Sequence, residues 1–186
     1  MKTHFDIEKM VESNFISNEL DYERALIADR KLRILEKDNI HFKKLRVKLR
    51  DLIEKYENAE WKDADKIDEF KIEESEKSER IAELERIFIE NRKQCIKKKL
   101  KEFDLTQQNL ALILGHKSKS HMSELMNGIK PFTLKDLVII NRILKIDITL
   151  LIPVFLSNEE QIRLKDVVKV LDKPKMKLTE KDLISV

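Results

Sequence analysis

The chain of 186 residues carries a formal net charge of +3 and contains only two glycines and three prolines. Long segments with apolar residues at helical spacing and so few helix breakers predict an all-α protein. The single cysteine, Cys95, excludes an intrachain disulfide and a zinc site built from cysteines. No apolar run approaches the roughly 20 residues of a membrane span, and the first residues lack an apolar signal sequence. We therefore expect a cytoplasmic protein with no membrane partner.

Residues 1–60 are predicted to form an N-terminal helical interaction domain. Residues 1–15 fit either a short helix or a packed arm, and two longer helical segments follow, separated by Asp38-Asn39. Such a pair of antiparallel helices is a helical hairpin. Because two helices alone bury little apolar surface, we expect the hairpin to bind a partner or a second copy of the chain. The candidate partner-binding residues on its apolar stripes are Tyr22, Leu26, Leu45, Leu49 and Leu52.

Residues 61–91 differ in composition, because fourteen acidic residues outnumber seven basic ones between positions 54 and 90. Pairs of opposite charge four residues apart, such as Glu73 with Lys77, are typical of an exposed helix. A short heptad-like stripe that includes Ile81 and Leu84 leaves a coiled coil open. The favoured interpretation is a long, charged and solvated connecting helix.

Residues 92–156 are predicted to form a compact bundle of about five helices, beginning with a helix over residues 92–103. Residues suited to capping or ending helices recur along it: Thr106, Ser118 and Thr133 at starts, Gly115 and Gly128 at ends. Two short helices joined by a short turn and backed by others make a helix-turn-helix, a motif that reads DNA. The last helix of the motif is expected to turn Leu134, Leu137, Val138, Asn141 and Leu144 inward.

The charge of the chain is unevenly distributed. Between positions 92 and 135, ten basic residues oppose three acidic ones, which gives this segment a local charge of +7. A polyanion is drawn to such a segment. The segment coincides with the predicted helix-turn-helix, so charge and motif both favour DNA as the partner.

Two stretches carry a family resemblance. LTQQNLALILG, from Leu105 to Gly115, followed by SKSHMSELMNGIKPFTL, from Ser118 to Leu134, is similar to the Xre/Cro-type helix-turn-helix and, more closely, to HigA-type antitoxins with a C-terminal DNA-binding domain. ISNELDYERAL, which begins at Ile16, resembles the NExxYxxAL segment of that family. The resemblance implies a lambda-repressor-like fold for the C-terminal bundle, a homodimer on double-stranded operator DNA, and a HigB-like toxin as protein partner. The connecting helix is longer here than in the family and lacks its proline.

The helix after Ser118 is the candidate recognition helix. Met122 and Leu125 form its apolar back. Its first turn and opposite side present the candidate base-reading residues Lys119, Ser120 and Glu124, whose side chains can hydrogen-bond to base edges in the major groove. For Glu124, an ion pair with Lys117 or Lys119 is an equally good interpretation. The candidates for contacts to phosphates and flanking positions are Gln107, Lys117, His121, Asn127 and Lys130; Asn127 is equally suited to ending the helix.

The leading hypothesis is a sequence-specific DNA-binding antitoxin that neutralises a HigB-like ribonuclease toxin and represses its own operon. The alternative is a helix-turn-helix transcriptional repressor with an N-terminal dimerisation or sensing domain and no toxin partner. An enzyme is not expected, because the sequence has no glycine-rich phosphate loop and no nucleophile–base pair, so no catalytic residue is assigned.

His116 and His121 share no helix face with acids or other histidines, so we expect no metal site, and no cofactor is expected either. Residues 157–186 form an additional tail beyond the family pattern. Ser157 and Glu160 make a capping box for a short helix that ends before Pro174, and the final residues are predicted to be loose or a weak strand.

Overall fold

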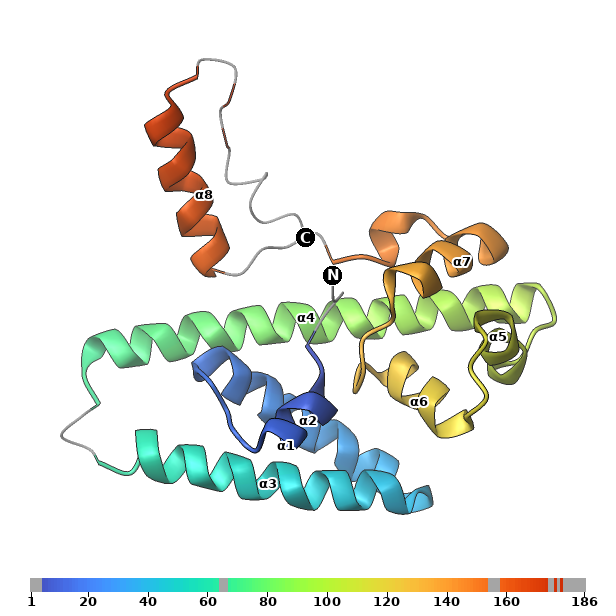
Figure 1. The fold of residues 1–186 in the computed structure, drawn as a ribbon, viewed down its shortest axis with the longest axis horizontal. Helices are drawn as coiled ribbons and strands as arrows, with labels where there is room; N and C mark the ends of the chain where they lie inside the picture. Colours follow the sequence, from blue (N-terminus) through green and yellow to red (C-terminus); the bar gives the residue numbers. More distant parts are fainter. Residues whose placement is uncertain (1–4, 64–66, 154–157, 174–175, 177, 179–186) are drawn as a thin grey trace.

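The computed structural model describes residues 5–63, 67–153, 158–173, 176 and 178. These residues form eight α-helices and two 3-10 turns, with no strand among them, which confirms the predicted all-α class (Figure 1). In the same described ranges, no helix is both long enough and apolar enough to cross a bilayer.

The N-terminal module consists of a short helix followed by a helical hairpin. The side chain of Asn18 caps the first helix of the hairpin by accepting a hydrogen bond from the Asp21 N–H, and Asn39 caps the second by accepting one from the His41 N–H. Residues 1–15, for which the sequence left two possibilities open, include a helix. The elements are α1 (Ile7–Ser13), α2 (Glu19–Leu35), the 3-10 turn η1 (Glu36–Asp38) and α3 (Ile40–Glu60).

A single helix of 34 residues, α4 (Glu69–Glu102), joins the N-terminal module to the C-terminal bundle. Asp68 caps its start by accepting from the Lys71 N–H, and no glycine or proline interrupts it. The separate connecting helix and first bundle helix that the sequence suggested are therefore one continuous element. The domain boundary expected between residues 91 and 92 lies inside this helix.

One face of α4 packs against α2, so α4 is not the solvated connector that its charge predicted. It buries Ser78 and Ala82 where α2 buries Ala25 and Ala28. Small side chains let two helices approach closely, although they give almost no signal of apolar periodicity. An ion pair from Arg24 of α2 to Glu85 of α4 continues the same contact.

The hairpin therefore has a core without any partner protein. The helix α4 packs against α2 of the hairpin, and α1 packs against α3. Leu45, Leu49 and Leu52, which we expected to offer an apolar partner surface, are all buried in this core, while Tyr22 and Leu26 are half-buried at its edge. Each of the three leucines consequently exposes 7% of its surface or less in this conformation.

The C-terminal bundle has a second core, formed by the last third of α4 and three shorter helices. Thr106, Ser118 and Thr133 cap those helices as predicted, and Gly115 and Gly128 end two of them at positive φ. The expected inner stripe of the last helix was partly wrong, since Leu134 and Val138 are exposed. The elements are α5 (Gln107–Leu114), α6 (Lys119–Asn127), α7 (Leu134–Leu144) and the 3-10 turn η3 (Ile148–Leu150).

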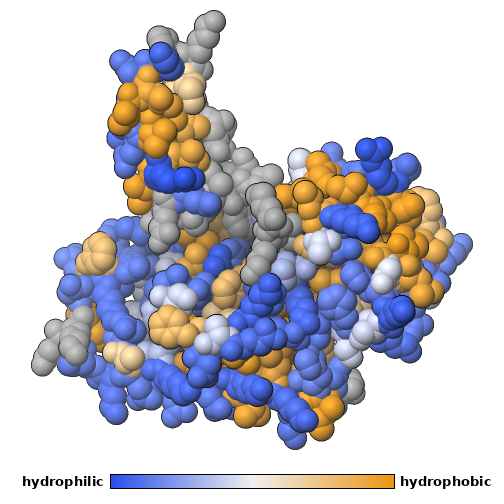
Figure 2. Space-filling model, in the orientation of Figure 1, coloured by the Kyte–Doolittle hydropathy of each residue, from blue (hydrophilic) through white to orange (hydrophobic). Residues whose placement is uncertain are grey.

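The last helix, α8 (Asn158–Leu171), projects away from both modules (Figure 1). Its exposed apolar side chains and those over α7 form the two largest hydrophobic areas on the face seen in Figure 2. The predicted capping residue Ser157, the predicted helix stop Pro174 and the segment after residue 178 lie outside the described residues.

Candidate nucleic-acid interface

The starts of α5 and α6 lie side by side and are rigidly capped. Thr106 accepts a hydrogen bond from the Asn109 N–H at 3.1 Å, and Asn109 accepts one from the Thr106 N–H at 2.8 Å. Ser118 accepts from the His121 N–H at 3.2 Å. Each cap satisfies a backbone N–H that the helix itself leaves free, and the remaining N–H groups at each start can bind an anion.

Between these two helix starts lies a concavity of about 360 Å³. Its polar lining comprises Gln107, Gln108, His116, Lys117, Ser118 and Lys119. Lys117 and Lys119 are exposed and make no ion pair with any residue that the structure describes. Two unpaired ammonium groups beside two helix N-termini make a surface suited to phosphate. The structure thus brings together three of the predicted contacts, Gln107, Lys117 and Lys119.

The segment that builds this surface matches a known family. Residues 96–151 match the family model described as "Helix-turn-helix". Residues 96–151 form a helix-turn-helix DNA-binding domain. The match begins in the last part of α4, so the long helix supplies the first helix of this domain, and it ends at Leu151, which is fully buried in the second core. Neither the curated proteins nor the solved structures gave a match to the chain.

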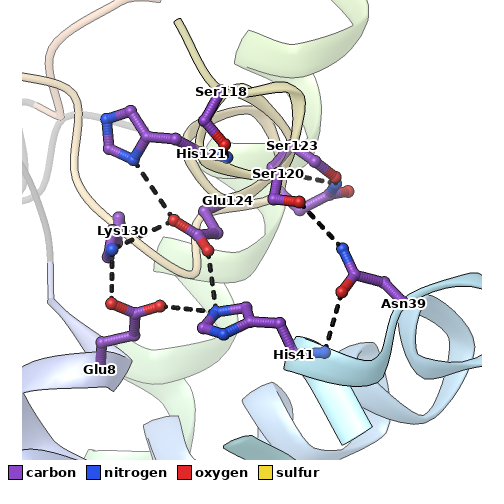
Figure 3. Close-up of polar contacts among 10 residues, drawn as sticks. Glu8, Asn39, His41, Ser118, Ser120, His121, Ser123, Glu124 and Lys130 are labelled. Carbon is purple, nitrogen blue, oxygen red and sulfur yellow. Dashed lines mark hydrogen bonds and ion pairs between the residues drawn. The ribbon is translucent and has the colours of Figure 1, made fainter. Parts of the chain in front are cut away.

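The predicted recognition helix is α6, and part of the side that was predicted to read bases is covered by the N-terminal module (Figure 3). The Oγ of Ser120 accepts a hydrogen bond from the side-chain amide of Asn39, at 3.2 Å. Glu124 is only 4% exposed, and its Oε1 lies 2.9 Å from His41 Nε2. Two of the three residues predicted to read bases are therefore engaged by the start of α3.

Glu124 takes the ion-pair role that the sequence left open, but with partners other than Lys117 or Lys119. Its Oε2 lies 3.1 Å from Lys130 Nζ and 3.3 Å from His121 Nδ1. Lys130 also pairs with Glu8 of the N-terminal module, and the other oxygen of Glu8 lies 2.9 Å from His41 Nε2. Lys130 was expected to face a phosphate; here it joins two carboxylates inside the protein.

Two members of the cluster, Glu8 and Lys130, have shifted pKa values. Burial raises the pKa of Glu8, but the hydrogen bonds and charges of Lys130 and His41 outweigh burial and bring the pKa below its ordinary value. Burial lowers the pKa of Lys130, and the two carboxylates, Glu8 and Glu124, outweigh this effect and raise it overall. At neutral pH these shifts favour the charged forms of Glu8 and Lys130.

The donor atoms of Glu8, His41 and Glu124 all lie within 4.8 Å of one another, a spacing that a metal ion could use. The sequence gave no sign of this group, because the three residues are far apart in the chain and we considered only His116 and His121. Lys130 already supplies a cation to both carboxylates, and His41 contacts their remaining oxygens. We interpret the cluster as a salt-bridge network between modules.

Two other expectations change with the structure. Arg92 was counted in the basic segment, yet it is 2% exposed, donates to the Leu151 carbonyl at 3.3 Å and stacks over the rings of Phe88 and Phe132. Burial lowers its pKa to about 10. Arg92 therefore ties α4 to the end of the domain. Asn127 donates to the Ser123 carbonyl at 2.9 Å, within its own helix.

His121 is half-buried next to His116, and their rings meet edge to face with centroids 4.8 Å apart. His116 Nε2 lies 3.3 Å from Asp136 Oδ1, in a geometry that makes no hydrogen bond. His121, which was predicted to contact DNA phosphates or flanking positions, thus contacts Glu124 of its own helix. The sequence did not single out Glu8, Asn39 and His41 for these contacts, because nothing in local periodicity marks a contact to a distant helix.

Proposed function

We propose that the protein is a transcriptional repressor that binds operator DNA as a homodimer through the starts of α5 and α6. The observation that carries the proposal is the concavity between these helix starts, with Lys117 and Lys119 exposed and unpaired beside it. In this motif the first turn of the recognition helix enters the major groove, and the start of the preceding helix meets the backbone. Lys119 then reaches base edges, and Lys117 and Gln107 reach phosphates.

The test is a selection of duplexes from genomic DNA at low salt, followed by titration of the best duplex. Affinity for it should fall steeply as salt rises, because each neutralised phosphate releases counterions. Lys119→Ala should relax the sequence preference, whereas Lys117→Ala should weaken binding to all duplexes alike and reduce the salt dependence. Lys55→Ala, at the far end of α3, is the matched control and should change neither. Failure to enrich any duplex would remove the DNA proposal.

A second candidate is an antitoxin that neutralises a HigB-like ribonuclease toxin and represses its own operon. Support comes from the resemblance of residues 16–26 and 118–134 and from a cleft of about 600 Å³ beside the first of these segments. The cleft is bordered by Phe15 and Phe70, which are 65% and 72% exposed. Leu52 forms part of its wall, whereas Leu45 and Leu49 do not line it. Exposed aromatic residues around a cleft are common anchors for a protein partner.

Coexpression with the product of the neighbouring gene tests this candidate. A toxin that binds in the cleft should co-purify with the wild-type protein and be lost from a Phe15→Ser, Phe70→Ser variant. Ile34→Ser serves as the matched control, because Ile34 is equally exposed (68%) but lies at the other end of α2. If no small basic protein co-purifies, or if the control variant loses it as completely, the antitoxin candidate is abandoned and the repressor remains.

A further inference from the structure

The N-terminal module contacts the recognition helix on the side that should face the bases. Asn39 and His41, at the start of α3, bind Ser120 and Glu124 at consecutive turns of α6 (Figure 3). These are side-chain contacts across two modules that are separate in the sequence. They leave Lys119 free but occupy the next two positions of the same surface.

A second group of contacts anchors the end of α6 to the same module. Ile129, which follows the helix stop at Gly128, is 1% exposed and belongs to the N-terminal core. Its carbonyl accepts a hydrogen bond from the Ile7 N–H at 3.1 Å. Gly128 lies so close to Ile89 of α4 that an added Cβ would sit 2.7 Å from Ile89 Cγ2. The C-terminal end of α6 is therefore packed against both the N-terminal module and α4.

We propose that the N-terminal module competes with DNA for α6, so that this structure is a closed state and binding requires the start of α3 to move away. The proposal rests on the proposed function and adds its regulation. The physical reason is space: the major groove is about 12 Å wide and admits one helix of about that diameter. With α3 packed against Ser120 and Glu124, α6 cannot enter the groove to the depth at which these residues read bases.

The contact is built so that it can open without leaving a buried charge unpaired. When His41 leaves, Glu124 keeps Lys130 and His121 as partners. His41 itself is already 46% exposed at its side chain and gains solvent. The Oγ of Ser120, which accepts a hydrogen bond from the Asn39 side-chain amide in the closed state, becomes free to bind DNA. Because a ligand's apparent affinity is its intrinsic affinity reduced by the open fraction, the closed contact weakens DNA binding by the same factor.

The first test is a variant that opens the contact while preserving the fold. Asn39→Ser keeps an oxygen to cap α3 but is too short to reach Ser120, and His41→Ala removes the contact to Glu124. The double variant should bind the selected duplex about threefold to tenfold more tightly than the wild type, and it should still unfold in one cooperative transition, at a melting temperature a few degrees lower because two polar contacts are lost. Asn58→Ser, an exposed asparagine at the far end of α3, is the matched control and should bind like the wild type.

The second test uses the chemical reactivity of His41 in the full-length wild-type protein. Diethyl pyrocarbonate modifies free imidazole nitrogens, and the Nε2 of His41 lies between two carboxylates in the closed state. Adding the selected duplex should increase modification of His41, measured by mass spectrometry, and decrease modification of His121. The opposite change at His41 would mean that α3 itself touches the DNA and would overturn the proposal.

The outcomes separate the two levels of inference. If the wild type binds DNA and the double variant binds equally or more weakly, the closed state is wrong and the repressor stands. If only the double variant binds, both are supported. If neither protein binds any duplex, the DNA function fails and its regulation fails with it.

Discussion

Replacing Gly128 by alanine tests how firmly the end of the recognition helix is fixed on α4. Gly128 has φ +72°, and a Cβ built there would lie 2.7 Å from Cγ2 and 2.9 Å from Cδ1 of Ile89. The left-handed conformation costs an ordinary residue about 1–2 kcal/mol. Ile89 is β-branched and sits in a helix, where one χ1 rotamer is strongly preferred, so it cannot swing away easily. Overpacking of this kind costs about 1–3 kcal/mol more.

Gly115 supplies the matched control, because it ends α5 with φ +81° and an added Cβ would meet nothing within 4 Å. Gly115→Ala should therefore be destabilised only by the cost of placing an alanine in the left-handed conformation, about 1–2 kcal/mol. Thermal and urea unfolding, followed by circular dichroism, measure both variants. For a chain of this size each kcal/mol lowers the melting temperature by about 2–4 °C, so Gly128→Ala should melt several degrees below Gly115→Ala. Equal losses would refute the close approach of the helix end to Ile89.

Three further predictions follow from buried charges. Burial, and then the charge of Lys93, lowers the pKa of Lys31 to about 8. Between that pH and about pH 10 the unfolded chain binds more protons than the folded chain, so the stability should rise with pH. Lys31→Met should remove this rise and should increase the free energy of unfolding at pH 7, measured by urea titration, by about 1–3 kcal/mol. Arg92→Ala should cost about 2–4 kcal/mol by calorimetry, since it empties the space between two aromatic rings. Glu8 has a lowered pKa, so its contribution is present at neutral pH and lost as pH falls through the folded-state value; Glu8→Gln should flatten the acid side of the melting-temperature profile.

The elements that could be predicted from the sequence are those whose cause is local. Caps at Thr106, Ser118 and Thr133 and the stop at Gly128 depend on a residue and its neighbours within one turn. The apolar back of α6 was likewise visible as spacing. Such signals are sufficient for the helix-turn-helix and for the position of its recognition helix.

The contacts between modules could not be predicted, for two physical reasons. The seam of α4 on α2 uses Ser78 and Ala82, which pack by close approach and carry little hydrophobic signal. The polar cluster joins Glu8, His41 and Glu124, and each is an ordinary surface-type residue when only its own helix is considered. Their contacts can be recognised only in the tertiary structure, because it is the packing of distant helices that buries Glu124, a residue predicted to face DNA.

The two groups of contacts that close α6 differ in strength, and this difference indicates where the module should hinge. Full burial of the Ile129 side chain contributes about 1.5–3 kcal/mol, whereas the Asn39–Ser120 hydrogen bond contributes about 0.5–1.5 kcal/mol. The contacts of His41 to the carboxylates are weakened by solvent, since its side chain is 46% exposed. The polar contacts should therefore break first, with Ile129 remaining seated as the pivot. In the DNA complex, hydrogen exchange at the Ile7 amide, which donates to Ile129, should stay slow while His41 becomes reactive. Rapid exchange at Ile7 would mean instead that the whole N-terminal module leaves α6, and Ile129 would then be exposed in the complex.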